Sequence, residues 1–470
     1  MQSEIAVIES KSFLELLKRA VAGERKDFTS GSIKQALFML AVPMILEMIM
    51  ESLFAVVDVF YVSRVGVNAV ATVGLTESVM MIIYAIAIGL SMAATAFVAR
   101  RAGEKNFKAA AEAGMQALLL AVLITIPLSL TGIIFAGDIL HLMGASPAVI
   151  AEGKTYARIQ LGGHIIVMFL FLNNAVFRGV GDASIAMRVL WLANILNMLL
   201  GPVFIFGLGP VPALGVTGAA VATSLGRGIG VLFQFRNLTT DRSLIRVRLE
   251  NIRFDFPLMR QMFRVALGGM SQFLIGSASW IFMVRILSTF GSSAVAGYTI
   301  AFRTIVFTIL PSWGLANAAA TLVGQNLGAK QPDRAEKSVW TAAYYNMLFL
   351  TAVSVLFFIL AGRILNIYSS DPEVIRTGVF CLRIICLGYI FYAYGMVIGQ
   401  AFNGAGDTRT PTHLNLFCFW LIQIPAAYFL AKVLMLGPAG VFSAQAFSFS
   451  LSAILAVLIF RRGKWKMVKV

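Results

Sequence analysis

The sequence reads FRGVGD at residues 177–182 and FNGAGD at residues 402–407, so one motif recurs after 225 positions. The same ungapped offset relates further pairs of identical residues: Gly66 and Gly291, Gly103 and Gly328, Pro147 and Pro372, Arg158 and Arg383, and Gly215 and Gly440. A single offset that holds from near the start of the chain to near its end indicates a duplicated unit. We therefore expect two tandem copies of one structure.

The composition indicates that this duplicated unit lies in a membrane. Hydrophobic residues make up 59% of the 470 residues and charged residues only 13%, whereas soluble domains carry roughly a quarter charged residues. A chain this apolar lacks the polar surface that a water-soluble protein needs. Since a helix needs about 20 apolar residues to span a bilayer, we expect about twelve spans, near 34–62, 69–99, 109–135, 148–178, 185–207, 214–236, 265–289, 294–324, 335–362, 373–403, 410–432 and 438–460.

The distribution of basic residues predicts the orientation. The chain has 38 Lys and Arg against 22 Asp and Glu, a formal net charge of +16. With both termini in the cytoplasm, the basic residues gather in loops on the inner side, as the positive-inside rule requires. This accounts for the charge without a nucleic-acid partner. The two halves then share one orientation, as parallel repeats with the substrate path between them.

The repeat and the charges divide the chain into five expected parts. These are a cytoplasmic tail at 1–32, a six-helix N-lobe at 33–236, a basic linker at 237–257, a six-helix C-lobe at 258–462 and a basic tail at 463–470. Apolar residues from Phe13 to Val21 recur at helical spacing. They predict either a short helix on the inner membrane surface or a partly ordered tail.

The sequence lacks motifs typical of enzymes and metal sites. Cys381, Cys386 and Cys418 form no CxxC pair, which argues against a disulfide framework or a zinc site. The spans contain no HExxH or GxSxG motif, which argues against an intramembrane enzyme. We expect a protein that is not an enzyme and that has no cofactor.

Ionisable residues inside the spans are costly, and they mark candidate functional positions. The first span contains Glu47, Glu51 and Asp58, which lie on one stripe of a helix because they are spaced by four and seven residues. Glu77 in the second span is a fourth acid. At the 225-residue offset these positions hold Gln272, Gly276, Met283 and Phe302, so the acids belong to the first half alone.

Two chemical roles suit this acid cluster. Crowded carboxylates in a medium of low dielectric resist ionising together, which suits them to bind and release protons, and their oxygens could instead ligate Na⁺. The structural alternative is a set of buried acids paired with Arg285, Arg303 or backbone groups. A contact between Glu77 and Arg303 across the halves is a further hypothesis. Pro43 interrupts the first span and predicts a kink that a moving helix can use.

The sequence resembles the MATE multidrug exporter family. The likeness covers about residues 33–460, and it rests on Pro43, VVDVFYVSRVG (56–66), GEKNFKAA (103–110), FRGVGD, ILNMLLGPVFIFGLG (195–209), LGVTGAAVATS (214–224), GQNLGAK (324–330) and FNGAGD. The resemblance implies a V-shaped fold of two six-helix lobes. It also implies cation-coupled export of amphipathic, often cationic compounds.

The resemblance also implies a cation site, from which this sequence departs. Asp58 matches the family's first-helix aspartate, and Asn197 and Thr223 match the asparagine and threonine of the DinF-like branch. That branch usually has an aspartate where this chain has Gly201, and the second-lobe acids of the NorM-like branch are missing here. We infer that Glu51 replaces the missing acid from a different helix.

These observations predict a monomeric drug/H⁺ antiporter in the inner (plasma) membrane of a bacterial or archaeal cell. Na⁺ coupling is the closer alternative, with Asp58 and Asn197 as candidate ligands. A lipid-linked oligosaccharide flippase is the more distant one, because flippases tend to have extra helices and a strongly cationic cavity. Gln272 and Arg303 of the facing half would help to shape the drug cavity.

Overall fold

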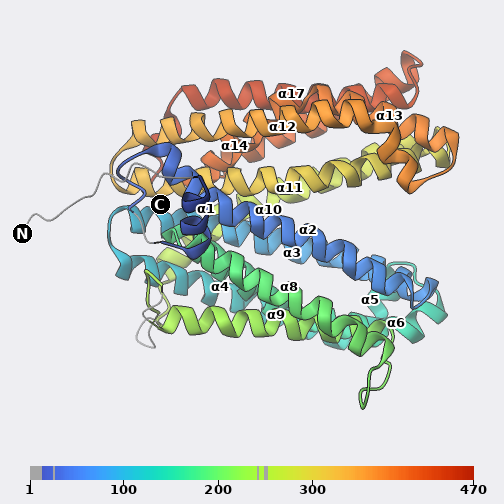
Figure 1. Cartoon of the computed structure of the whole chain (residues 1–470), viewed down its shortest axis with the longest axis horizontal. Coiled ribbons are helices and arrows are strands. Elements are labelled where there is room, and N and C mark those ends of the chain that lie inside the picture. Colours follow the sequence, from blue (N-terminus) through green and yellow to red (C-terminus); the bar gives the residue numbers. More distant parts are fainter. Residues whose placement is uncertain (1–12, 25–26, 241–242, 248–251) are drawn as a thin grey trace, which may run out of the picture.

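The structure, a computed structural model, describes residues 13–24, 27–240, 243–247 and 252–470, and within these ranges it is almost entirely helical (Figure 1). Arg242 and Arg248 of the expected linker lie outside the described residues. Eleven helical segments are long and apolar enough to cross a membrane, and one bent pair makes a twelfth. The expected number of spans is therefore confirmed.

The N-lobe begins with a short helix and continues with the six spans. Its elements are α1 Phe13–Ala22, α2 Ile33–Ser63, α3 Val67–Gly103, α4 Phe107–Ile134, α5 Ala136–Leu142, α6 Pro147–Gly162, α7 His164–Val180, α8 Ala183–Phe206 and α9 Val216–Thr239. The N-caps of α2 and α4 follow from local sequence, because the Ser32 and Asn106 side chains accept bonds from backbone N–H groups of the first turn. The sequence did not predict α5, whose seven residues are too few for a span.

The C-lobe repeats this order. Its elements are α10 Phe256–Ser288, α11 Ser292–Gly328, α12 Pro332–Tyr368, α13 Pro372–Leu387, α14 Tyr389–Ala405, α15 Arg409–Asn415, η2 Leu416–Gln423, α16 Ile424–Tyr428, η3 Phe429–Val433, α17 Pro438–Arg461 and the 3₁₀ turn η4 Lys464–Met467. The segments α13 and α14 form the bent pair, with an angle of 60° between them. Helix α10 starts nine residues before the predicted span, because Asp255 caps it ahead of Pro257.

Side-chain geometry repeats with the same offset as the sequence. Arg158 Nε donates to the Ile133 carbonyl at 3.1 Å, and Arg383 Nε donates to the Phe358 carbonyl at 3.2 Å. Gly181 and Gly406 both end their helices in the left-handed conformation, which glycine adopts without steric cost. The duplication therefore preserved loops as well as spans.

The first helix of each half packs against the second helix of the other half. Helix α2 contacts α8 of its own lobe and α11 of the C-lobe, while α10 contacts α15 of its own lobe and α3 of the N-lobe. Glycine permits both crossings. A Cβ built on Gly314 would lie 2.8 Å from the Met44–Ile45 backbone, and one on Gly89 would lie 2.5 Å from the Ala266 carbonyl. Gly89 and Gly314 are equivalent positions of the repeat.

The lobes meet at the end of the bundle where α1 and the C-terminus lie, and they separate toward the opposite end (Figure 1). At the closed end the last turns of α3 and α11 touch through glycines. A Cβ on Gly103 would lie 1.9 Å from the Gln325 carbonyl oxygen, and one on Gly328 would lie 2.1 Å from the Arg100 carbonyl oxygen. Gln325 Nε2 also donates to the Gly179 carbonyl at 2.9 Å. Only residues without a side chain allow so close a contact here.

Candidate functional site

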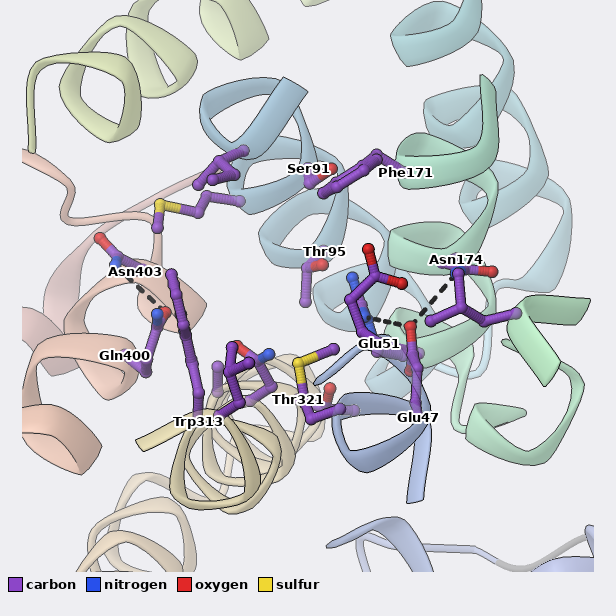
Figure 2. A pocket seen from close by; sticks show the side chains of 18 of the residues that line it. Glu47, Glu51, Ser91, Thr95, Phe171, Asn174, Trp313, Thr321, Gln400 and Asn403 are labelled. Atoms are coloured by element: carbon purple, nitrogen blue, oxygen red, sulfur yellow. Dashed lines mark hydrogen bonds and ion pairs between the residues drawn. The ribbon is translucent and has the colours of Figure 1, made fainter. Parts of the chain in front are cut away.

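A cavity of about 250 Å³ lies between the lobes, next to the α2–α11 crossing. Helices α2, α3, α7, α8 and α9 of the N-lobe line it together with α11 and α14 of the C-lobe (Figure 2). Three buried oxygens that line it, Glu47 Oε2, Ser91 Oγ and Thr321 Oγ1, form no hydrogen bond with any described residue. Buried polar atoms usually have partners, so this cavity is suited to a polar or protonated guest.

Glu47 is a charged residue of the cavity lining. Its Oε1 accepts hydrogen bonds from Arg178 Nη1 at 3.0 Å and from Asn174 Nδ2 at 3.2 Å, both on α7 (Figure 2). Glu47 is 2% exposed. The predicted acid is therefore held within its own lobe, by the arginine of the FRGVGD motif.

Glu51 lies one turn along α2 and also lines the cavity. Its Oε2 accepts a hydrogen bond from Asn194 Nδ2 of α8 at 3.1 Å. Gly201 lies further along α8, and a Cβ there would lie 3.3 Å from the Tyr61 ring. The tyrosine ring thus fills the space beside Gly201, and Glu51 of α2 meets α8 at Asn194, about two turns before Gly201.

Asp58 lies apart from the other two acids of the stripe. It is eleven residues beyond Glu47 on α2, or about 16 Å along the axis, and it does not line the cavity. Asn197 Nδ2 donates to Thr223 Oγ1 at 2.7 Å, so these two predicted residues do meet. Among the described residues neither of them hydrogen-bonds Asp58, and no cluster of three metal-ligating side chains is found.

Glu77 and Arg303 are both exposed on their helices, and no ion pair joins them in the described part of the chain. The physical reason is the divergence of the lobes toward this end of the bundle (Figure 1). The hypothesised pair therefore forms no direct contact, although the two charges lie close enough to interact electrostatically. The direct ion-pair partner of Glu47 comes from the N-lobe.

Sequence reasoning missed Arg227 of α9, which lines the cavity and is 8% exposed. Its guanidinium lies over the Phe54 ring, 5.7 Å from the ring centre. A signal was present, because Arg227 falls inside the predicted span 214–236, where a charge is costly. The polar residues Asn174 and Asn194 sit inside predicted spans in the same way.

The C-lobe wall is polar without charge. Asn403 Nδ2 donates to Gln400 Oε1 at 3.2 Å (Figure 2). Gln272, which does not itself line the cavity, donates through Nε2 to Asn403 Oδ1 at 3.0 Å. Trp313 of α11 adds an aromatic face to the same cavity. The indole could stack on a planar or cationic ring.

Pro43 lies buried within α2, directly before the Met44–Ile45 backbone that packs on Gly314. The predicted hinge residue thus lies at the crossing of α2 with the other lobe. Helix α2 continues through Pro43 as one element, from Ile33 to Ser63.

Known proteins resemble this chain over most of its length. It is 26% identical over 449 residues to the "Probable multidrug resistance protein NorM" of Thermotoga maritima, covering 92% of this chain and 93% of that protein. It is also 26% identical over 409 residues to the "FAD transporter" of Shewanella oneidensis, covering 86% of this chain and 89% of that protein.

A solved structure described as an outward-facing conformation of a multidrug resistance MATE family transporter superposes with a TM-score of 0.87. It is 27% identical, covering 94% of this chain and 98% of that one. The sequence model of the MatE family matches this chain twice, at residues 43–203 and 269–429, so each half carries one copy of the family unit. The chain belongs to the MatE family of membrane transporters.

Proposed function

We propose that this chain exports small amphipathic, often cationic organic compounds across the cell membrane in exchange for external H⁺. The observation that carries the proposal is the cavity between the lobes, where Glu47 and Glu51 line one wall and Trp313 with neutral amides lines the other. A wall with carboxylates can take up a cation or a proton, and an aromatic wall can accept a planar ring. The names of the relatives support the substrate class.

The basic loops and both ends of the chain lie at the closed end of the bundle, and the positive-inside rule supports a cytoplasmic position for that end. The lobes then separate toward the outside, which corresponds to an outward-open state (Figure 1). In the proposed cycle an external proton reaches Asp58 first and Glu51 next along α2. Loss of charge lets α2 repack at Pro43 against Gly314, the drug leaves outward, and the lobes rock about the two glycine crossings.

Protonation can drive this cycle only if the outward-open and inward-open states bind protons with different affinity. The two states expose different parts of the α2 stripe, since Glu47 lies at the closed end of the cavity and Asp58 lies toward the open end. Na⁺ coupling would use the same carboxylates, with Asn197 as a candidate neutral ligand, whose side chain bonds to Thr223. The chain would act as a monomer in the bilayer and need no cofactor.

Ethidium efflux from proteoliposomes under an imposed ΔpH or ΔpNa tests the proposal. We expect efflux with ΔpH alone, loss of coupling in Asp58→Asn and Glu51→Gln, and normal activity in Glu112→Gln, an exposed acid of the same lobe. Efflux that depends on ΔpNa alone would replace H⁺ by Na⁺. Unimpaired proton-coupled efflux in Glu51→Gln would refute its coupling role.

A further inference from the structure

The charged groups that line the cavity balance one another. They are the acids Glu47 and Glu51 and the arginines Arg178 and Arg227, all from the N-lobe. Glu47 and Arg178 are directly paired at 3.0 Å. Glu51 is bonded to the neutral Asn194, and no described residue forms an ion pair with Arg227. The second acid and the second base thus share the cavity without direct contact.

Arg227 lies beside the acid stripe of α2. Phe54, the ring beneath its guanidinium, comes three residues after Glu51 and four before Asp58. Residues at these spacings lie on one face of a helix, so the guanidinium sits between the two carboxylates. Its charge acts on both of them.

Close packing of α9 on α8 sets this position. Glycines flank Arg227 in the segment SLGRGIG, residues 224–230. A Cβ on Gly226 would lie 2.6 Å from the Ala193 carbonyl oxygen, and one on Gly230 would lie 3.2 Å from Ala193 Cβ. Larger residues at 226 and 230 would push α9 outward and carry the guanidinium away from α2.

We infer that Arg227 is a built-in counter-ion, which competes with a cationic substrate for Glu51 and Asp58 and thereby sets the charge preference of the cavity. This inference rests on the proposed function. With both carboxylates ionised, Arg227 compensates one of them and leaves the other for an organic cation. When protons neutralise them, Arg227 keeps its charge, because guanidinium stays protonated in proteins. The uncompensated positive charge then repels a bound cation.

Other ionisable groups face Arg227 and contribute to the pH dependence. Tyr84 and Glu77 of α3 interact with it electrostatically. Glu47 of α2 and Arg178 of α7 line the same cavity, and Tyr156 of α6 interacts electrostatically with Asp58 and Glu77. Arg178 pairs directly with Glu47, whereas Arg227 forms no ion pair with any described residue. Protonation of Glu51 or Asp58 therefore changes the electrostatic environment of Arg227 more than that of Arg178.

Equilibrium binding of ethidium, a cation, and riboflavin, an uncharged aromatic compound, to purified protein tests the inference. We expect Arg227→Gln to bind ethidium about tenfold more tightly at neutral pH, because one competing charge is gone. Ethidium binding should also resist acidification better than in the unmodified protein. Riboflavin affinity should not change, and Arg227→Lys should behave like the unmodified protein. In efflux, KM and kcat for ethidium should both fall in Arg227→Gln.

The inference would be overturned if Arg227→Gln showed the same ratio of ethidium to riboflavin affinity as the unmodified protein, and the same pH dependence of ethidium binding. If Arg227→Gln fails to fold, Arg227→Met and the double variant Arg227→Gln/Glu51→Gln serve instead. The double variant should return ethidium affinity toward the unmodified value, because one charge of each sign is removed, and an affinity as low as that of Glu51→Gln alone would also overturn it. Absence of gradient-driven efflux in the unmodified protein would instead count against the proposed function.

Discussion

Arg178 donates to Glu47 at 3.0 Å across α7 and α2, and the residues at the equivalent positions of the second lobe, Asn403 and Gln272, are also bonded to each other at 3.0 Å. The duplication kept the contact and exchanged an ion pair for an amide pair. Three of these four residues, Glu47, Arg178 and Asn403, line the same cavity, so one guest meets a charged wall and a neutral wall.

Replacing the N-lobe pair by its C-lobe counterpart tests whether the charges there serve function or packing. Arg178→Ala should destabilise the protein by about 3–5 kcal/mol, because Glu47 is left charged and buried. Glu47→Gln/Arg178→Asn should recover most of the melting temperature, because an amide pair fills the same positions in α10 and α14. Thermal unfolding in detergent measures both. A double variant as unstable as the single one would refute the structural equivalence of the two pairs.

The glycine contact at the closed end should control access to the cavity from the cytoplasm. Gly103→Val places atoms where the Gln325 carbonyl lies, so α3 and α11 must separate. The reporter is a cysteine introduced into the cavity lining by Thr95→Cys, in a chain whose Cys381, Cys386 and Cys418 are replaced. An impermeant thiol reagent added on the side of the termini should label this cysteine faster in Gly103→Val than in the same chain with Gly103.

Gly74→Ala on the same helix is the matched control, because a Cβ there meets nothing within 4 Å. Labelling that stays as slow in Gly103→Val as in this control would show that the closed end does not depend on the glycine contact.

An aspartate introduced at position 201 should not take over the proposed coupling role of Glu51. The ring of Tyr61 would lie 3.3 Å from a Cβ at Gly201, and its hydroxyl donates to the Met198 carbonyl at 3.4 Å. An aspartate there must displace this ring, so Gly201→Asp should lower stability and leave Glu51→Gln uncoupled. Proton-driven ethidium efflux measures the coupling. Recovery of efflux in Gly201→Asp/Glu51→Gln would contradict the view that Tyr61 occupies this site.

The C-terminal tail should hold the closed end together. Trp465 is 1% exposed and stacks on Phe460 of α17, with ring centres 4.6 Å apart, while Arg100 of α3 donates to the Val468 carbonyl at 3.1 Å. The tail therefore joins the C-lobe to the N-lobe. Trp465→Ala should cost about 3 kcal/mol, the usual loss for a large buried ring, and should open the same end to the thiol reagent.

The ion contacts of the tail should persist at neutral pH. The hydrogen bond to Glu336 raises the pKa of Lys466 above its ordinary value of 10.5. A raised pKa means that the contribution of Lys466 is complete below that ordinary value and is lost only as pH rises through the higher one. Labelling through the closed end should therefore not increase between neutral and mildly alkaline pH. An increase in that range would show that Lys466 does not hold the tail.

The sequence by itself determined the number of spans and the duplication. Both depend on local properties, the length of apolar runs and the residues at turns, and Gly181 and Gly406 end their helices for the same backbone reason in each copy. It also placed Glu47, Glu51 and Asp58 on one face of α2, because helical spacing fixes which side chains share a stripe.

Only the tertiary structure decided the partners of these acids. Glu47 meets Arg178, 131 residues away in sequence, and Glu51 meets Asn194, 143 residues away. Such contacts depend on how α2, α7, α8 and α9 cross, and these crossings depend on glycines that fit against a particular backbone. The position of a charge in the chain predicts that it needs a partner, whereas helix packing selects which residue becomes that partner.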